Sequence, residues 1–178
     1  MIKFFDLEKQ DKSLHKSILR DIKKLFKRGD FILGKEVLKF EKNFAKFCES
    51  NYAISCANGT DALTIALKSL NLEKNSEVII PAMTYCSTAF SVINANLKPV
   101  LVDTEPFKPT IDASKIKKKI TSKTKVIMPV HLYGSAANLN AIKKIIKKNN
   151  IFLIDDCAQA HGTIDDSNTT YNKKIGST

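Results

Sequence analysis

The chain has 178 residues, a length that suits one α/β domain and is short for two. Its composition, 43% hydrophobic and 26% charged with only 6 Gly and 5 Pro, excludes a disordered or collagen-like chain. The net charge is +11, but the lysines are spread along the chain and only Arg20 and Arg28 are arginines. Because proteins that read nucleic acids rely on arginine for bidentate contacts, we expect a lysine-rich solvated surface and no nucleic-acid partner.

The cysteines and the chain start limit the kinds of site and the compartment. The four cysteines stand far apart, without a C-x-x-C pair and without histidine at metal-ligand spacing, which predicts neither a disulfide framework nor a metal site. The opening MIKFFDLEKQDK has acidic residues by position six, and eighteen apolar residues never run together. We therefore expect a cytoplasmic protein that does not engage a membrane.

Two amphipathic helices come first along the chain. Apolar residues recur at helical spacing over residues 14–26, and the pattern ends at Gly29. The same period returns over residues 37–47. The sequence therefore predicts an N-terminal helical segment over residues 1–50, followed by an α/β domain over residues 51–178.

From residue 52, short apolar runs alternate with helical stretches. The expected strands cover residues 52–56, 77–80, 98–103, 125–130 and 151–155, and the expected helices cover 60–70, 85–95, 112–120 and 138–148. This alternation predicts βαβ units and a mostly parallel sheet covered on both faces. Residues 164–174 predict a polar loop or hairpin. Since ligands of such sheets lie beyond the carboxyl ends of the strands, the residues that follow each strand are the candidates for chemistry.

The first two strands are followed by a helix start and by a tyrosine. Gly59 and Thr60 open a helix, whose unpaired N–H groups and threonine hydroxyl suit a phosphate. The alternative is an ordinary N-cap made by Asn58 or Thr60. The stretch is neither a P-loop nor G-x-G-x-x-G, so ATP and NAD gain no support. Tyr85 can lay its ring on a planar ligand or simply pack against the protein.

Two carboxylates and a histidine follow the fifth expected strand. Asp155 and Asp156 are costly if buried without partners, so at least one is expected to meet a cation, a metal or a protonated ring nitrogen. The alternative is that both cap the next helix in water. His161 either faces a ligand or makes a local structural hydrogen bond. For His131, after the fourth strand, a structural role is favoured.

Six stretches, in this order, resemble one known family. They are FILGKEVLKFEKNFAKF (31–47), NGTDAL (58–63), EVIIPAMTY (77–85), KPVLVD (98–103), TSKTKVIMPVHLYGSAANL (121–139) and IDDCAQAHG (154–162). The chain resembles the pyridoxal 5'-phosphate (PLP)-dependent sugar aminotransferases of the DegT/DnrJ/StrS type, and PVHLYG followed by DDCAQAHG is the most specific part. The resemblance implies the large α/β domain of the aspartate-aminotransferase fold (PLP fold type I), ending before the C-terminal small domain.

The resemblance also implies PLP as the cofactor and assigns roles to residues. Asp156 resembles the carboxylate that keeps the pyridine nitrogen protonated, so that the ring acts as an electron sink. Gln159 resembles the residue that hydrogen-bonds near the phenolic oxygen, and Tyr85 resembles the aromatic residue stacked on the ring. Gly59 and Thr60 resemble the phosphate-binding helix start.

The resemblance assigns no specific role to two further residues that match the family pattern, Asp155 and His161. Asp155 stands where the family has Asp or Glu. His161 matches the family's AHG segment and is expected near the substrate or the site, without a role assigned to it.

The implied reaction moves an amino group from an amino acid, first of all glutamate, to a keto sugar attached to a nucleotide. Such reactions serve the biosynthesis of cell-surface polysaccharides or deoxyamino sugars, and enzymes of this type are homodimers that share their sites, so a homodimer is expected. Two alternatives stay open. One is a PLP-dependent sugar dehydratase of the same family, in which histidine replaces the catalytic lysine, and the other is a non-catalytic, truncated remnant.

The family's Schiff-base lysine is the main departure from the pattern. It lies downstream of a segment matched here by residues 171–177, so the resemblance places it beyond Thr178. Lys173 and Lys174 match the residues ahead of that segment's glycine and do not replace it. We therefore expect a fragment without a catalytic residue of its own and without turnover alone. We also expect its exposed apolar helix faces, for example at Ile18 and Phe40, to cause aggregation or dependence on a partner.

Overall fold

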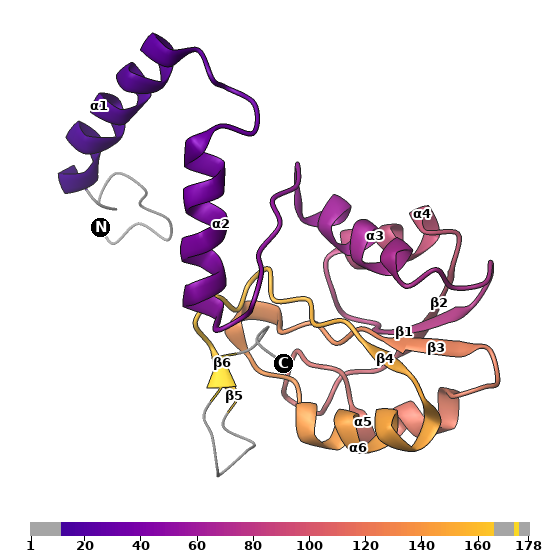
Figure 1. The fold of residues 1–178 in the computed structure, drawn as a ribbon. Helices are drawn as coiled ribbons and strands as arrows, with labels where there is room; N and C mark the ends of the chain where they lie inside the picture. The colour runs from indigo at the N-terminus through magenta and orange to yellow at the C-terminus, as the bar shows by residue number, and fades with distance from the viewer. Residues whose placement is uncertain (1–11, 166–172, 175–178) are drawn as a thin grey trace. The chain divides into compact units, whose positions relative to one another are not determined.

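The computed structural model describes residues 12–165 and 173–174 (Figure 1). The chain divides into two units, Met1–Asn43 and Phe44–Thr178. The boundary falls inside the helix α2 (Lys35–Cys48), which therefore begins in one unit and ends in the other. The expected organisation into residues 1–50 and 51–178 stays a prediction.

The first unit contains the first of the two expected amphipathic helices and most of the second. The helix α1 (Lys12–Arg28) ends in basic residues, which favourably meet the negative end of its dipole. Arg28 ties the end of α1 to the start of α2, because its guanidinium donates to Asp30 at 3.0 Å and to Glu36 at 2.6 Å. Phe26 on α1 is 70% exposed, which agrees with the expectation of exposed apolar side chains on this helix.

A parallel sheet organises the second unit. Its strand order is β2-β1-β3-β4, and every neighbouring pair is parallel, as the sequence predicts. All five residues of the inner strand β1 are buried, which is typical of a parallel strand covered on both faces. The strands are β1 (Glu77–Pro81), β2 (Lys98–Val102), β3 (Thr124–Ile127) and β4 (Phe152–Leu153).

Helices cover both faces of this sheet (Figure 1). One face carries α3 (Gly59–Ser69) and α4 (Cys86–Asn94). The other carries α5 (Ala113–Ile116), which continues as a 3-10 turn over Lys117–Lys119, and α6 (Leu139–Asn149). The four expected helices after residue 59 are therefore confirmed.

Alternate side chains of β1 divide the core into two clusters, because successive residues of a strand point to opposite faces. Val78 and Ile80 belong to a cluster with Leu67 of α3 and Val92 of α4. Ile79 belongs to the cluster on the other face, whose buried members are Ile79, Val102, Ile111, Ile116, Ile127, Ala137, Ile142, Ile145 and Ile151.

The prediction of a strand over residues 52–56 is wrong. The structure has no strand there, and Tyr52 and Ile54 are 84% and 88% exposed. The run has the residue types of a strand, but a strand also needs a neighbour for its hydrogen-bond ladder. Within residues 12–165 and 173–174 nothing pairs with it.

The end of the described chain forms two short strands. β5 (Ile164–Asp165) pairs antiparallel with β6 (Lys173–Lys174), which agrees with the hairpin alternative for this polar stretch. Residues 166–172 and 175–178 lie outside the described residues, and so does most of the segment expected ahead of the catalytic lysine. None of the helices in the described part of the chain has the length and apolar character needed to cross a membrane.

Glu77 is a buried carboxylate at the start of β1, and it gives the first testable prediction. The hydroxyl of Thr121 donates to it at 2.6 Å and the Lys98 ammonium lies at 3.3 Å. These two contacts, the hydroxyl first, hold the pKa of the Glu77 carboxyl below its ordinary value. A lowered carboxyl pKa stabilises the fold above the unfolded-state pKa, and this contribution is lost as the pH falls through the folded-state pKa.

Glu77→Gln is therefore expected to lower the free energy of unfolding at pH 7 by about 1.5–3 kcal/mol, the usual range for hydrogen bonds to a charged group. The difference from the unmodified protein should shrink as the pH falls from 7 to 3. Urea unfolding measured across this range checks it. Glu73→Gln, at an exposed position nearby, is the matched control. Its free energy of unfolding should stay within about 0.5 kcal/mol of that of the unmodified protein. Equal effects of the two variants would contradict the prediction.

Candidate active site

A pocket of about 380 Å³ lies where three segments of the second unit meet. Its volume falls in the range of small-molecule sites. The walls come from the start of α3, from the start of α4 after β1, and from the stretch after β4, as expected for a ligand site at the carboxyl ends of parallel strands. The lining residues are Asn58, Gly59, Thr60, Leu63, Tyr85, Ser87, Thr88, Asp156, Ala158 and Gln159.

The start of α3 forms one wall of this pocket. The Asn58 side chain caps the helix by accepting from the Asp61 N–H at 2.9 Å, so the capping interpretation holds for Asn58. The first N–H groups of a helix, here those of Gly59 and Thr60, have no acceptor within the helix. A Cβ built on Gly59 would meet nothing within 4 Å, so the approach to this helix start is open. The local geometry suits an anion.

A hydroxyl pair links this wall to α4. The Thr60 hydroxyl donates to the Ser87 hydroxyl at 2.8 Å. Because Thr60 uses its proton in this bond, the hydroxyl that can donate to a ligand here is that of Ser87. The sequence reasoning missed Ser87, although it follows Tyr85 by only two residues.

Tyr85 stands just ahead of α4 and lines the pocket with a ring that is 68% exposed. Such exposure is inconsistent with the alternative in which the ring simply packs inside the protein. The exposed ring leaves a face on which a planar ligand can stack.

Asp156 is the buried carboxylate of the pocket, with the residue only 8% exposed. Its Oδ2 accepts from the Thr88 hydroxyl and its Oδ1 from the Ala158 N–H, both at 3.2 Å. The backbone is held as well, because the Asp156 N–H donates to Pro129 and its carbonyl accepts from the His131 N–H, each at 3.0 Å. These bonds fix the orientation of a carboxylate that is buried and not surrounded by water. The alternative of a carboxylate capping a helix in water is therefore wrong for Asp156.

Asp155 faces a histidine. The side chain of Asp155 is 7% exposed, and its Oδ1 lies 3.7 Å from Nε2 of the fully buried His131. Nδ1 of His131 accepts from the Ala137 N–H at 3.0 Å, which leaves Nε2 as the ring nitrogen that faces Asp155. His131 therefore has the structural position expected of it, and the two neighbouring carboxylates have different surroundings.

Gln159 is oriented by the loop that follows His131. Its Oε1 accepts from the Tyr133 N–H at 2.8 Å, so the amide Nε2 is the group left to donate to a ligand. The loop turns sharply there, since Tyr133 and Gly134 have φ angles of 55° and 80°. The Thr163 hydroxyl also donates to the Gly134 carbonyl at 3.2 Å, which ties the same loop to the chain after Gln159.

His161 lies apart from these residues. Its side chain is exposed, its ring is 5.6 Å from that of Phe44 in an edge-on arrangement, and it does not line the pocket. A place near the substrate stays a prediction for His161.

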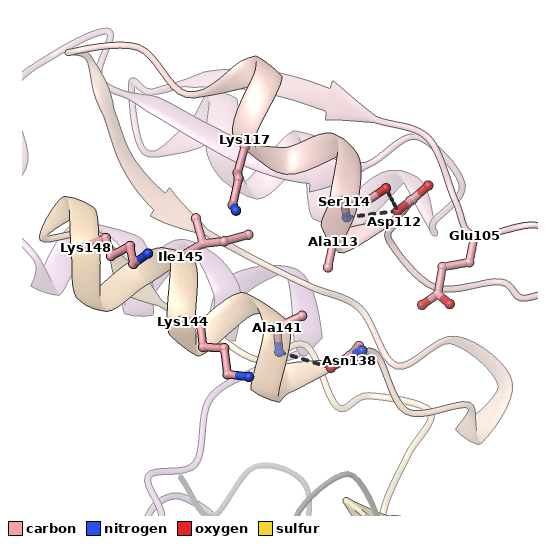
Figure 2. Close-up of a pocket in the computed structure, with 10 residues that line it drawn as sticks. All are labelled: Glu105, Asp112, Ala113, Ser114, Lys117, Asn138, Ala141, Lys144, Ile145 and Lys148. Atoms are coloured by element: carbon pink, nitrogen blue, oxygen red, sulfur yellow. Dashed lines mark hydrogen bonds between the residues drawn. The ribbon is translucent and has the colours of Figure 1, made fainter.

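A second pocket, of about 540 Å³, lies between α5 and α6 (Figure 2). Two of its polar side chains serve as helix caps, because Asp112 accepts from the Ser114 N–H at 2.9 Å and Asn138 accepts from the Ala141 N–H at 3.0 Å. Three exposed lysines also line it, namely Lys117, Lys144 and Lys148. Since no candidate from the sequence lies here, the first pocket is the candidate active site.

Cys157, next to Asp156, is a half-buried thiol, and burial followed by the charge of Asp155 raises its pKa to about 12. Because only the thiolate is alkylated, iodoacetamide at pH 8 should label Cys157 at least about a hundredfold more slowly than the exposed Cys56. Peptide mapping by mass spectrometry over a time course measures both rates. In urea the two rates should converge, and equal rates in the folded protein would refute the prediction.

Metal binding has no support in this part of the molecule. Across the ranges that the structure describes, no three His, Cys, Asp or Glu side chains gather to hold a metal ion.

Solved structures with the same fold define the class of protein. The crystal structure of S. venezuelae DesV in complex with a ketimine intermediate matches with a TM-score of 0.92 and 32% identity, over 99% of this chain and 46% of that chain. A GDP-4-keto-6-deoxymannose-3-dehydratase with a trapped PLP-glutamate geminal diamine matches with a TM-score of 0.76 and 29% identity, over 81% of this chain and 39% of that one. The fold is that of the PLP-dependent aminotransferases of fold type I.

The chain belongs to the DegT/DnrJ/EryC1/StrS aminotransferase family, whose model matches residues 12–178. The dTDP-3-amino-3,6-dideoxy-alpha-D-galactopyranose transaminase of Aneurinibacillus thermoaerophilus is 41% identical over 178 residues, which are 99% of this chain and 47% of that protein. The chain thus spans about half the length of the curated relatives it matches. The family resemblance found in the sequence is confirmed.

Proposed function

We propose that this chain forms the cofactor-binding part of a PLP-dependent aminotransferase that moves an amino group from glutamate to a keto sugar attached to a nucleotide. The observation that supports this most is the gathering of five residues around one pocket, although they come from three distant segments. They are Gly59, Thr60, Tyr85, Asp156 and Gln159. The relatives' names, which include transaminases of nucleotide-linked sugars, support this proposal. We propose that the reaction serves the biosynthesis of cell-surface polysaccharides or deoxyamino sugars.

The pocket residues fit PLP in charge and in hydrogen-bonding capacity. A carboxylate has about four acceptor sites, so Asp156 can accept from a protonated ring nitrogen besides its bonds to Thr88 and Ala158. Such a cation also offsets the cost of burying the charge. The open helix start at Gly59 and the Ser87 hydroxyl suit the phosphate.

Each residue then has a distinct task. Asp156 holds the proton on the ring nitrogen, Tyr85 supports one ring face, and the Nε2 of Gln159 donates toward the phenolic oxygen. With these residues in place, the cofactor supplies an electron sink for the charge left when the substrate loses its α-proton. The lysine that moves this proton is expected beyond Thr178, so we expect turnover only from a protein that also supplies it. We further expect this protein to be a homodimer.

Binding of pyridoxamine 5'-phosphate tests the pocket, because this form needs no covalent bond to lysine. Titration calorimetry on the protein made from the complete gene should give saturable binding. Pyridoxamine without the phosphate, the matched control, should bind at least about a hundredfold more weakly, since it lacks the charged hydrogen bonds at the start of α3. Equal binding of the two compounds, or no binding, would contradict the proposed site.

The reaction is tested with glutamate and a keto sugar nucleotide. Amino transfer predicts one 2-oxoglutarate for each amino sugar formed. The structural similarity to a sugar dehydratase supports the second candidate, for which a histidine should stand at the lysine position and the sugar should lose water without gaining nitrogen. A stop codon after Thr178, together with no binding of the cofactor, would instead favour the non-catalytic remnant.

A further inference from the structure

We infer that Thr88 is a positioning residue for Asp156, and that Thr84 acts on the same carboxylate through Thr88. The inference rests on the proposed function, because it concerns the carboxylate that would pair with the cofactor ring. It adds two hydroxyls, those of Thr84 and Thr88, to which the sequence analysis assigned no role.

The two hydroxyls form a directed chain. Thr88 is buried at 1% exposure, and its hydroxyl donates to Oδ2 of Asp156 at 3.2 Å. The Thr84 hydroxyl lies 2.8 Å from that of Thr88. A hydroxyl has one proton, so Thr88, which gives its proton to Asp156, must accept from Thr84. The order of donation is Thr84 to Thr88 to Asp156, and each bond polarises the next.

The bond that Thr88 makes is not the usual one for a threonine inside a helix. Such a hydroxyl ordinarily donates to a carbonyl one turn back, as Thr64 on α3 does to Thr60 at 2.8 Å. Thr88 instead reaches Asp156, 68 residues away in the sequence. A side chain that leaves its local partner for a distant carboxylate fixes where that carboxylate points.

The position of Thr88 on α4 gives the bond its significance. Tyr85 precedes Thr88 by three residues, which is about one helical turn, and both line the pocket. The same turn therefore carries the ring platform and the donor to Asp156. With Ala158 on Oδ1 and Thr88 on Oδ2, both oxygens are held, and the carboxylate keeps its orientation.

The test compares threonine variants in the protein made from the complete gene, with pyridoxamine 5'-phosphate as the probe. Thr88→Val removes the hydroxyl and keeps the shape, and Thr88→Ser keeps the hydroxyl. Thr110→Val is the matched control, since Thr110 is also fully buried and donates to a carboxylate, Glu105 at 3.4 Å, away from the pocket. The readouts are the dissociation constant and the pH at which the near-ultraviolet spectrum reports loss of the proton from the ring nitrogen.

Thr88→Val is expected to weaken binding about tenfold and to lower the pH of ring deprotonation by about one unit, because the ion pair with Asp156 loses a supporting bond. Thr88→Ser and Thr110→Val should stay within about twofold of the unmodified protein in binding. The dissociation constant of Thr84→Val, and its pH of ring deprotonation, should fall between those of Thr88→Val and of the unmodified protein. These values follow from a hydrogen bond to a charged group.

Two results would overturn the inference while the proposed function stands. In the first, the unmodified protein binds the probe, and Thr88→Val has the same dissociation constant and the same pH of ring deprotonation as Thr110→Val. The other is a Thr88→Ser variant as impaired as Thr88→Val, which would make the methyl group, not the hydroxyl, the important part. If Thr88→Val does not fold, an unchanged titration of Thr84→Val overturns the inference. An unmodified protein that does not bind the probe refutes the proposed function and the inference together.

Discussion

Asp156→Asn should lower kcat for amino transfer by about a thousandfold in the protein made from the complete gene. The amide has nearly the same shape as the carboxylate, so the pocket keeps its form, but it has no charge to hold a proton on the ring nitrogen. Removing one preorganised electrostatic group from an active site costs about a hundredfold to a thousandfold in rate. Steady-state kinetics with glutamate and the keto sugar nucleotide, together with a thermal melt, measure the effect.

Asp155→Asn is the matched control for this variant. Asp155 is an adjacent buried carboxylate, but it faces Nε2 of His131 and does not line the pocket. Its substitution should change kcat less than about tenfold, while its thermal stability falls because a buried contact is altered. Equal loss of rate in the two variants would contradict the separate roles assigned to the two carboxylates.

Ile79→Ala should lower the free energy of unfolding by about 3–5 kcal/mol. Ile79 is fully buried at the centre of β1, and it packs in the cluster that contains Val102, Ile127 and Ile145. Truncation removes several buried carbons and leaves a cavity, because a sheet held on both sides by hydrogen bonds relaxes only partly. Urea unfolding followed by circular dichroism provides the measurement.

Ile65→Ala serves as its control. Ile65 lies on α3 and is 56% exposed, so the same change of residue removes little buried surface there. The loss should stay below about 1 kcal/mol. A loss for Ile79→Ala no larger than that for Ile65→Ala would show that the cluster around Ile79 is not a stabilising core.

The parallel sheet is predictable from the sequence because each buried strand is a short apolar run and each covering helix has an apolar stripe. These are local properties, and they place β1 and α6 within a few residues of their observed bounds. Residues 52–56 have the same local property without forming a strand. They differ in having no neighbouring strand within the described residues. A local sequence pattern carries no information on whether such a neighbour exists.

Some residues of the candidate site could likewise be predicted from the local sequence, and others could not. Asp156 and Gln159 follow a strand directly, so their position along the chain marks them. Ser87 and Thr88 become notable only through their bonds to Thr60 and Asp156, which lie 27 and 68 residues away. A hint was present, since both hydroxyls stand within one turn after Tyr85. The direction of the Gln159 amide depends on the fold of another loop, and local sequence holds no information on it.

The origin of the pocket walls has a consequence for the lifetime of the protein. The walls come from the start of α3 and from the chain after β4, about a hundred residues later. A ligand that touches both can bind only when the intervening sheet is folded. At a hundred times its dissociation constant, such a ligand stabilises the folded state by about 2.7 kcal/mol. Without such a ligand, the open form is therefore populated about a hundred times more, and a protease that acts on open chains removes the unliganded chain first. If the proposed cofactor is this ligand, its supply sets how much of the protein persists.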